Sequence, residues 1–130
     1  MNLIDSNLII AYFRPKEDKH EAACKFIDSL ESFAIHDYVL LEVSTVLQLR
    51  EGHDTAKQAI DFLQNTDGLK FLRLSQEELE MTLDLFLKQQ EKISFIDASL
   101  LILSRERELT LATLDQDLIK CGKKRFPSRH

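Results

Sequence analysis

Four acidic residues occupy positions where a carboxylate is costly or well placed for chemistry. Asp5 follows the short apolar run Leu3-Ile4, and Glu42 lies in the middle of an apolar helical stripe. Asp97 lies near the start of an apolar helix, and Asp115 follows the last predicted strand. Carboxylates gathered without a countercharge repel one another and raise one another's pKa values, and a divalent metal ion relieves that repulsion. The four acids therefore predict a metal site.

The available ligand types favour Mg²⁺ or Mn²⁺, because these hard ions prefer carboxylate oxygens and water. The four histidines show no paired spacing, and Cys24 and Cys121 show no CxxC spacing, so we expect free thiols and no zinc site. One such ion polarises a phosphoryl oxygen and generates a hydroxide nucleophile, and a second would stabilise the leaving oxygen. Phosphate ester hydrolysis is the chemistry that this site predicts.

Each acid also has a purely structural explanation. That explanation is a helix cap for Asp5 and a salt bridge or a peripheral position for Glu42. Asp5 precedes an apolar helix and could serve only as its N-cap. Glu42 has Val39 and Val43 at offsets of −3 and +1, which predicts that its carboxylate faces the core. Burial of an unpaired charge costs several kcal/mol, so a core position requires a cation, a metal or a proton. A salt bridge to an Arg or Lys, or a place at the edge of the stripe, is the alternative.

The two later acids could act as helix caps instead of metal ligands. Ser94 and Asp97 have the spacing of a capping box. Asp115 and Asp117 could each cap the short helix that follows, and for Asp117 a cap or a supporting role is favoured. About ten residues of helix carry the chain roughly 15 Å from Asp97, and about six extended residues return it by roughly 20 Å. Asp115 can therefore return beside Asp97.

Short apolar runs alternate with helical periodicity along the whole chain, which is typical of an α/β protein with a short, mostly parallel sheet covered by helices. The first helix follows Asp5 and ends before Pro15, because proline disfavours helical backbone in the residue before it. The expected strands cover residues 3–4, 33–35, 69–74 and 109–112, and the later helices cover about 18–30, 38–50, 55–64, 75–87 and 95–107. Functional residues of such sheets lie at the carboxyl ends of the strands.

Composition limits the class of protein. The 130 residues are 44% hydrophobic, which suits one domain spanning residues 1–130. Glycine and proline together number 5, which argues against collagen-like, low-complexity and turn-rich β-sandwich folds. The formal charge of −5 argues against general attraction to polyanions. The sequence shows neither a membrane span nor a secretory signal, so we expect a soluble, cytoplasmic protein that does not bind membranes.

The acids and their neighbours together resemble the PIN domain family, and most closely its VapC-type toxins. The matching segments are Asp5-Ser6-Asn7, Val39-Leu40-Leu41-Glu42-Val43, Phe95-Ile96-Asp97-Ala98 and Thr113-Leu114-Asp115. Each motif is short, but the four acids are separated by 37, 55 and 18 positions and span nearly the whole chain. Two features depart from the family pattern. Arg107-Glu108 stands where a glycine often precedes the last strand, and Leu118 stands where an aromatic residue is common.

The resemblance implies a fold, an activity and a set of partners. The fold is a PIN-like three-layer sandwich, and the activity is that of a Mg²⁺- or Mn²⁺-dependent endoribonuclease, the toxin of a toxin-antitoxin pair that inhibits translation. The expected partners are an RNA substrate, an antitoxin that covers part of the nuclease groove, and a second copy of the chain in a homodimer. On this pattern Asp5, Glu42, Asp97 and Asp115 bind metal, Asp117 could add a carboxylate, and the residues that support the acids through hydrogen bonds are Ser6, Asn7 and Thr113.

An acidic nuclease still needs cations that hold RNA. The segment from Leu118 to His130 contains no acid, and we expect its basic residues, together with two cations beside the first motif, to contact phosphates. The alternative is a solvated, frayed terminus. The candidate contacts are Arg14, Lys16, Lys120, Lys123, Lys124, Arg125 and Arg129.

Two other functions fit parts of the pattern. A receiver-like phosphoacceptor domain has a similar size and an acidic Mg²⁺ pocket, but it usually carries paired acids after the first strand, whereas Ser6 follows Asp5 here. A PIN fold retained as a non-catalytic binding module is the second alternative, and the complete set of four acids argues against it.

Overall fold

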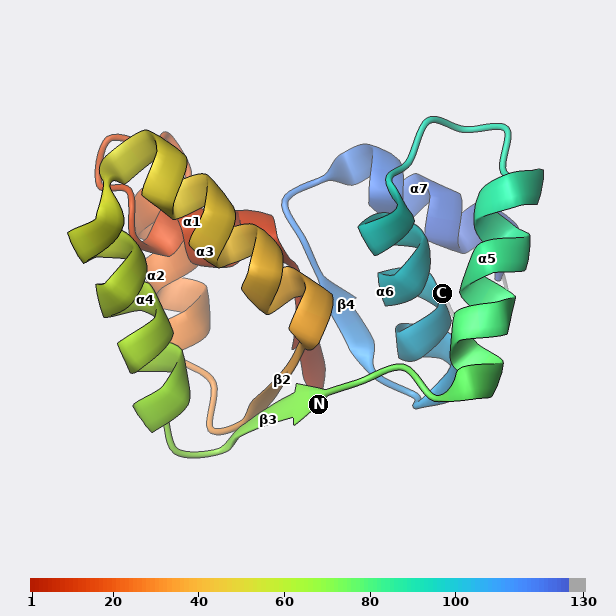
Figure 1. Cartoon of the computed structure of the whole chain (residues 1–130), viewed down its shortest axis with the longest axis horizontal. Coiled ribbons are helices and arrows are strands. Elements are labelled where there is room, and N and C mark those ends of the chain that lie inside the picture. Colours follow the sequence, from red (N-terminus) through yellow and green to blue (C-terminus); the bar gives the residue numbers. More distant parts are fainter. Residues whose placement is uncertain (127–130) are drawn as a thin grey trace.

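A four-stranded parallel sheet organises the chain (Figure 1). The structure is a computed structural model, and it describes residues 1–126. The strands are β1 (Asn2–Ile4), β2 (Phe33–His36), β3 (Leu69–Leu72) and β4 (Thr110–Ala112). The helices are α1 (Ser6–Tyr12), α2 (His20–Asp28), α3 (Asp37–Glu51), α4 (His53–Asn65), α5 (Gln76–Lys88), α6 (Phe95–Glu106) and α7 (Gln116–Arg125).

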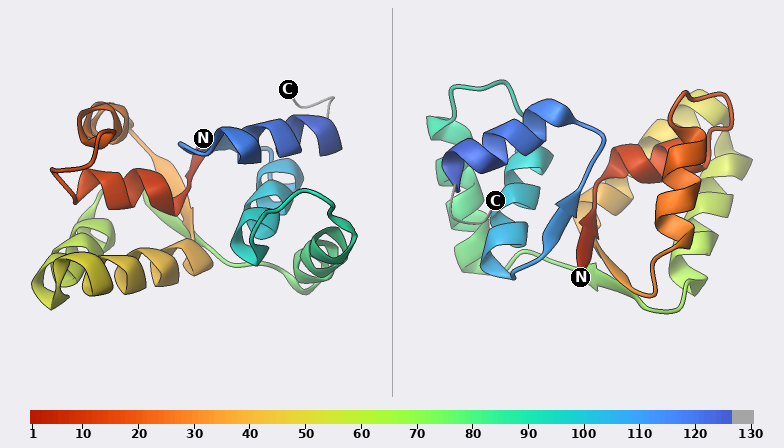
Figure 2. Two further views of the ribbon diagram at one scale, coloured as in Figure 1. Left: turned by 90° about the horizontal axis from the view of Figure 1, so that it is seen from above. Right: turned by 180° about the vertical axis from the view of Figure 1, so that it is seen from behind.

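The strand order β3-β2-β1-β4 divides the helices between the two faces of the sheet. From β1 to β3 the chain moves steadily in one direction, and then it crosses back to place β4 on the other side of β1. Crossovers between parallel strands are right-handed, so this reversal moves the later helices to the opposite face. Helices α1 to α4 lie on one side of the sheet and α5 to α7 on the other (Figures 1 and 2). The expected three-layer α/β architecture is confirmed.

Two hydrophobic clusters hold the layers together. The larger cluster joins the strands to α1, α2, α3 and α4, and it also includes Leu100 and Leu103 of α6. The smaller cluster joins α6 to α7 through Leu101, Leu118 and Cys121. Leu118 is fully buried there, so this residue fills the position where the family commonly has an aromatic side chain. Within residues 1–126 no helix is long and apolar enough to cross a membrane.

Most predicted elements agree with the structure to within about two residues. The strand predicted over residues 69–74 ends earlier, at Leu72, because its partner β2 ends at the paired residue His36. Before β4, Glu108 adopts a φ of 54°, in the left-handed region that favours glycine. The missing family glycine therefore corresponds to a real conformational requirement that Glu108 meets at a cost of about 1 kcal/mol.

Two glycines occupy left-handed backbone in very different surroundings. Gly68 in the turn before β3 has a φ of +80°, and a Cβ there would lie 2.3 Å from the Glu31 carbonyl oxygen. Gly52, between α3 and α4, has a φ of +98° and no atom within 4 Å of such a Cβ. Only at Gly68 does the close approach of backbone add to the conformational requirement.

These surroundings predict unequal effects of alanine at the two glycines. We expect Gly52→Ala to lower the free energy of unfolding by roughly 1–2 kcal/mol, the cost of left-handed backbone. We expect Gly68→Ala to lower it by at least about 1 kcal/mol more, because the turn must also move away from Glu31. Urea unfolding monitored by circular dichroism measures both values, and equal losses would contradict the predicted steric contribution.

Candidate active site

Asp5 lies where the chain leaves the middle of the sheet. It follows β1, its backbone N–H donates to the Ala112 carbonyl of β4 at 2.9 Å, and it is the N-cap residue of α1. After β1 the chain turns to the face of α1, whereas after β4 it turns to the face of α7 (Figure 2). Such a switch point at the carboxyl ends of parallel strands opens a crevice where ligands bind in α/β proteins. Asp5 therefore lies at the switch point between β1 and β4, where a ligand-binding site is expected.

The carboxylate of Asp5 is almost completely buried, with 4% of the residue exposed. Burial raises its pKa from 3.8 to about 6, although hydrogen bonds from the Thr113 hydroxyl and the Ser6 N–H oppose the shift. The negative charges of Asp97 and Glu42 make smaller contributions to the same rise in the pKa. Three of the predicted acids are therefore close enough to interact electrostatically around Asp5.

Two polar side chains tie the end of β4 to the first motif. The Thr113 hydroxyl donates to Asp5 Oδ2 at 2.8 Å and accepts from Asn7 Nδ2 at 2.9 Å. Asn7 Oδ1 in turn accepts the Leu114 N–H at 3.1 Å. Ser6 completes the contacts, because its backbone N–H donates to Asp5 Oδ1 at 2.7 Å. Ser6, Asn7 and Thr113 thus fix the buried carboxylate by hydrogen bonds.

Glu42 does not face the core as the sequence predicted. It is half-buried on α3, and its Oε1 accepts a close hydrogen bond from the Ser6 hydroxyl of α1. The buried stripe of α3 consists of Val39, Val43 and Leu47. Because successive helical residues are offset by about 100°, Glu42 lies beside that stripe and turns toward α1. The alternative of a place at the edge of the stripe is therefore correct.

Asp97 combines a helix cap with proximity to Asp5. Its Oδ2 accepts the Ser94 N–H at 3.0 Å and its own N–H donates to Ser94 Oγ at 3.0 Å, so the predicted capping box at the start of α6 is present. The residue is half-buried, and its charge acts on Asp5. The same carboxylate therefore caps α6 and contributes to the raised pKa of Asp5.

Asp115 and Asp117 begin α7. Asp115 Oδ1 accepts the N–H groups of Asp117 and Leu118 at 2.9 and 3.1 Å, so the carboxylate serves as an N-cap. The Asp115 N–H donates to Thr113 Oγ1 at 3.0 Å, which connects it to the hydrogen bonds around Asp5. Asp117 is exposed and lines a separate pocket with Glu91 and Lys120.

The donor chemistry at Asp5 suits a hard divalent cation, because carboxylate and hydroxyl oxygens meet there. In residues 1–126, however, no three acidic, histidine or cysteine side chains are arranged so that they could hold a metal ion. The structure therefore brings Asp5, Glu42 and Asp97 into electrostatic contact without gathering them into a coordination cage. The four-acid metal site stays a prediction.

The cations predicted to bind RNA divide into paired and unpaired residues. Arg14 pairs closely with Glu17 and bonds Glu51 at 3.0 Å. Lys124 bonds Glu91 at 2.7 Å, and Arg125 bonds Gln89 at 3.0 Å. The exposed side chains of Lys16, Lys120 and Lys123 have no ion-pair partner within residues 1–126, and Arg129 lies outside that range.

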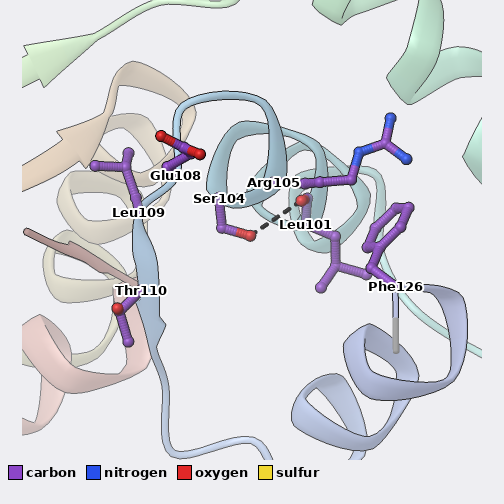
Figure 3. Close-up of a pocket in the computed structure, with 7 residues that line it drawn as sticks. All are labelled: Leu101, Ser104, Arg105, Glu108, Leu109, Thr110 and Phe126. Atoms are coloured by element: carbon purple, nitrogen blue, oxygen red, sulfur yellow. Dashed lines mark hydrogen bonds between the residues drawn. The ribbon is translucent and has the colours of Figure 1, made fainter. Parts of the chain in front are cut away.

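Another pocket lies beside the beginning of β4, away from the acids (Figure 3). Leu101, Ser104 and Arg105 of α6 form one wall, and the Arg105 guanidinium lies 4.3 Å from the centre of the Phe126 ring. Thr110 contributes from the start of β4, whereas Asp5 bonds to Ala112 at the other end of that strand. This pocket contains none of the predicted site residues.

Comparison with known proteins identifies the family. The family model of the PIN domain matches residues 3–124. The chain belongs to the PIN domain family. It is 27% identical over 117 residues to the ribonuclease VapC26 of Mycobacterium tuberculosis, and the match covers 88% of this chain and 86% of that protein.

Solved structures confirm the PIN fold. The Mycobacterium tuberculosis toxin VapC20, described as cleaving the sarcin-ricin loop, superposes with a TM-score of 0.85 at 18% identity, covering 94% of this chain and 95% of that chain. FitAcB from Neisseria gonorrhoeae gives a TM-score of 0.68 at 17% identity, covering 95% and 94%. VapBC2 from Rickettsia felis, bound to a promoter DNA fragment, gives 0.65 at 17% identity, covering 97% and 92%.

The raised pKa of Asp5 predicts an unusual pH dependence of stability in metal-free protein. Between pH 3.8 and about 6 the folded state retains a proton that the unfolded state releases, so rising pH lowers the free energy of unfolding. Asp5→Asn removes this contribution. Its stability relative to the parent should rise by roughly 2.5 kcal/mol between pH 4 and pH 8 in EDTA. Urea unfolding at several pH values measures the difference.

Asp67→Asn, in the exposed turn before β3, is the control for loss of a carboxylate. Its stability relative to the parent should change much less with pH than that of Asp5→Asn. Parallel pH profiles for the parent and Asp5→Asn would contradict the raised pKa.

Proposed function

We propose that this protein is a Mg²⁺- or Mn²⁺-dependent endoribonuclease. The observation that carries the proposal is the buried Asp5 carboxylate, whose pKa is raised to about 6 and which lies within electrostatic reach of Glu42 and Asp97 at the switch point of a PIN fold. A buried carboxylate surrounded by like charges is costly unless a cation joins it. A bound divalent ion would offset this cost, and hydrolysis of phosphodiesters is a reaction that such oxygen-bound ions catalyse.

The proposed metal ligands are Asp5, Glu42, Asp97 and Asp115, with one or two ions bound. When bound, the ion supplies an activated water and charge stabilisation at a phosphoryl oxygen. Asp5 contributes an anchored carboxylate, because Thr113 and Ser6 hold both of its oxygens. Ser6 also positions Glu42, and the capping box positions Asp97 at the start of α6. Asp117 stays outside this set because it is exposed and lines a different pocket.

The related proteins support a toxin role. The relative VapC26 is a ribonuclease, VapC20 is described as a toxin that cleaves the sarcin-ricin loop, and a similar fold occurs in a toxin-antitoxin complex from Klebsiella pneumoniae. We infer that this chain cleaves RNA in the cytoplasm so as to inhibit translation, and that an antitoxin restrains it. The alternative is a non-catalytic PIN-fold binding module, which the cleavage experiment below distinguishes.

The central test is RNA cleavage by purified protein. We expect cleavage of single-stranded or looped RNA in Mg²⁺ or Mn²⁺ and none in excess EDTA. Asp5→Asn and Asp97→Asn should abolish cleavage. Thr113→Val should reduce it by roughly 10- to 100-fold, because it removes a hydrogen bond that orients a ligand. Gel analysis of a labelled RNA measures the rates.

Asp67→Asn again serves as a matched control and should cleave at the parental rate. Cleavage by Asp97→Asn at that rate, or by the parent in excess EDTA, would contradict the proposed metal site. Absence of cleavage by the folded parent on structured and single-stranded RNAs would favour the binding module.

The exposed apolar face of α5 supports the proposed homodimer. Leu83, Phe86 and Leu87 share one face of that helix, and they are 45%, 41% and 81% exposed. Large apolar side chains gathered on one helix face indicate an interaction surface. We infer that this face packs against a second copy.

Replacement of the two leucines by lysine should disrupt self-association. Leu83→Lys/Leu87→Lys should behave as a monomer in light scattering after size exclusion, because burial of two ammonium groups at an interface is costly. Gln58→Lys/Gln64→Lys on α4 makes the same charge change at exposed positions and should retain the parental mass. A dimer that survives the α5 substitutions would contradict the assignment of this surface.

A further inference from the structure

A pocket of about 300 Å³ opens directly beside the proposed reaction site. Ser6, Asn7 and Glu42 form the wall that it shares with that site. The pocket extends away from the acids between α1 and α3 toward the connection from α1 to α2, where Lys19 and Arg50 contribute to its lining. A ligand in this pocket would therefore lie next to the group that the acids act on.

The charges on the far rim favour an anion. Lys19 and Arg50 are exposed, and neither has an ion-pair partner within residues 1–126. Glu17 also lines the pocket, but it is held by Arg14 and is thus already paired with a cation. The two unpaired cations leave the rim with a local positive charge on a protein of net charge −5.

The rest of the lining is apolar. Ile10 of α1, Val46 of α3 and Leu114 after β4 form a surface between the shared wall and the cations. A volume near 300 Å³ lies at the lower end of the range for small-ligand pockets, which suits one nucleotide unit. An apolar surface beside two cations matches the two halves of a nucleotide, a flat base and a phosphate.

We propose that this pocket binds the nucleotide next to the cleaved bond of the RNA substrate, with Lys19 and Arg50 contacting its phosphate and the apolar surface receiving its base. The proposal rests on the ribonuclease function proposed above. It places RNA contacts on α3 and on the residue before α2, which no sequence motif marks. It also explains how an acidic protein could hold RNA although Arg14, Lys124 and Arg125 are engaged with other side chains.

Binding of RNA tests the pocket separately from cleavage. The probe is a short, fluorescein-labelled, single-stranded RNA of mixed sequence, and binding to Asp97→Asn protein in Mg²⁺ is followed by anisotropy over a series of KCl concentrations. Addition of Lys19→Gln/Arg50→Gln should weaken binding roughly tenfold at ~0.1 M salt and reduce the salt slope by about 0.7 per lost phosphate contact. Lys57→Gln/Lys70→Gln makes the same charge change at exposed sites on α4 and β3 and should change binding less than twofold.

A third variant tests the apolar surface without a change of charge. Val46→Trp places a large side chain in the pocket and should weaken binding while it leaves the salt slope unchanged, with circular dichroism as the check on folding. Binding by Lys19→Gln/Arg50→Gln equal to that of the control pair, or no binding by the Asp97→Asn protein itself, would overturn the proposal. If the parent cleaves RNA and the two cations have no effect, the pocket proposal alone fails. If the parent never cleaves but binding depends on both cations, the ribonuclease proposal fails and the pocket is an RNA-binding pocket without a cleaved bond beside it.

Discussion

The buried carboxylate of Asp5 is the constraint on which the site depends. Its position follows from the strand order, because β1 and β4 are neighbours whose chains leave toward opposite faces of the sheet. The carboxylate lies at this point and is almost completely shielded from water, with 4% of the residue exposed. Desolvation is the largest contribution to its raised pKa, ahead of the charges of Asp97 and Glu42. The fold itself therefore creates a buried carboxylate whose pKa is raised to about 6.

The hydrogen bonds around Asp5 offset part of the free-energy cost of burying its negative charge. Thr113 and Ser6 together satisfy both oxygens of Asp5, and Asn7 fastens Thr113 and Leu114 to α1. Each bond to a charged group contributes about 1.5–3 kcal/mol, comparable to the penalty of a pKa shift of about two units. The result is a rigid carboxylate that remains easy to protonate, which is suitable for a group that exchanges a proton for a metal ion.

Sequence periodicity predicted the elements well, because the apolar runs are short and are bounded by caps and turns. The family resemblance, and not periodicity, identified Ser6, Asn7 and Thr113 as residues that support the acids. The pattern predicted that Glu42 faces the core, whereas Glu42 lies beside the buried stripe of α3. Neighbouring helical residues differ by about 100° in direction, so an apolar pattern does not fix which residues at the margin of a stripe are buried. The sequence left open the role of Asp115, because the same residue can cap a helix and bind an ion. Lys19 and Arg50 carry no sequence signal, since only tertiary packing brings them to one pocket.

The paired cations differ in what they connect on the two sides of the sheet. On the side of α7, Lys124 and Arg125 bond to Glu91 and Gln89, and these contacts fasten the last helix to the connection between α5 and α6. On the side of α1 and α3, Arg14 joins Glu17 to Glu51 and thereby fixes the chain segment that leads to Lys19. Arg14 thus stabilises a wall of the pocket between α1 and α3, while Lys19 and Arg50, which have no ion-pair partner within residues 1–126, contribute to its lining. Because α1 and α3 also carry Ser6 and Glu42, the elements that would position a nucleotide are the elements that position the acids.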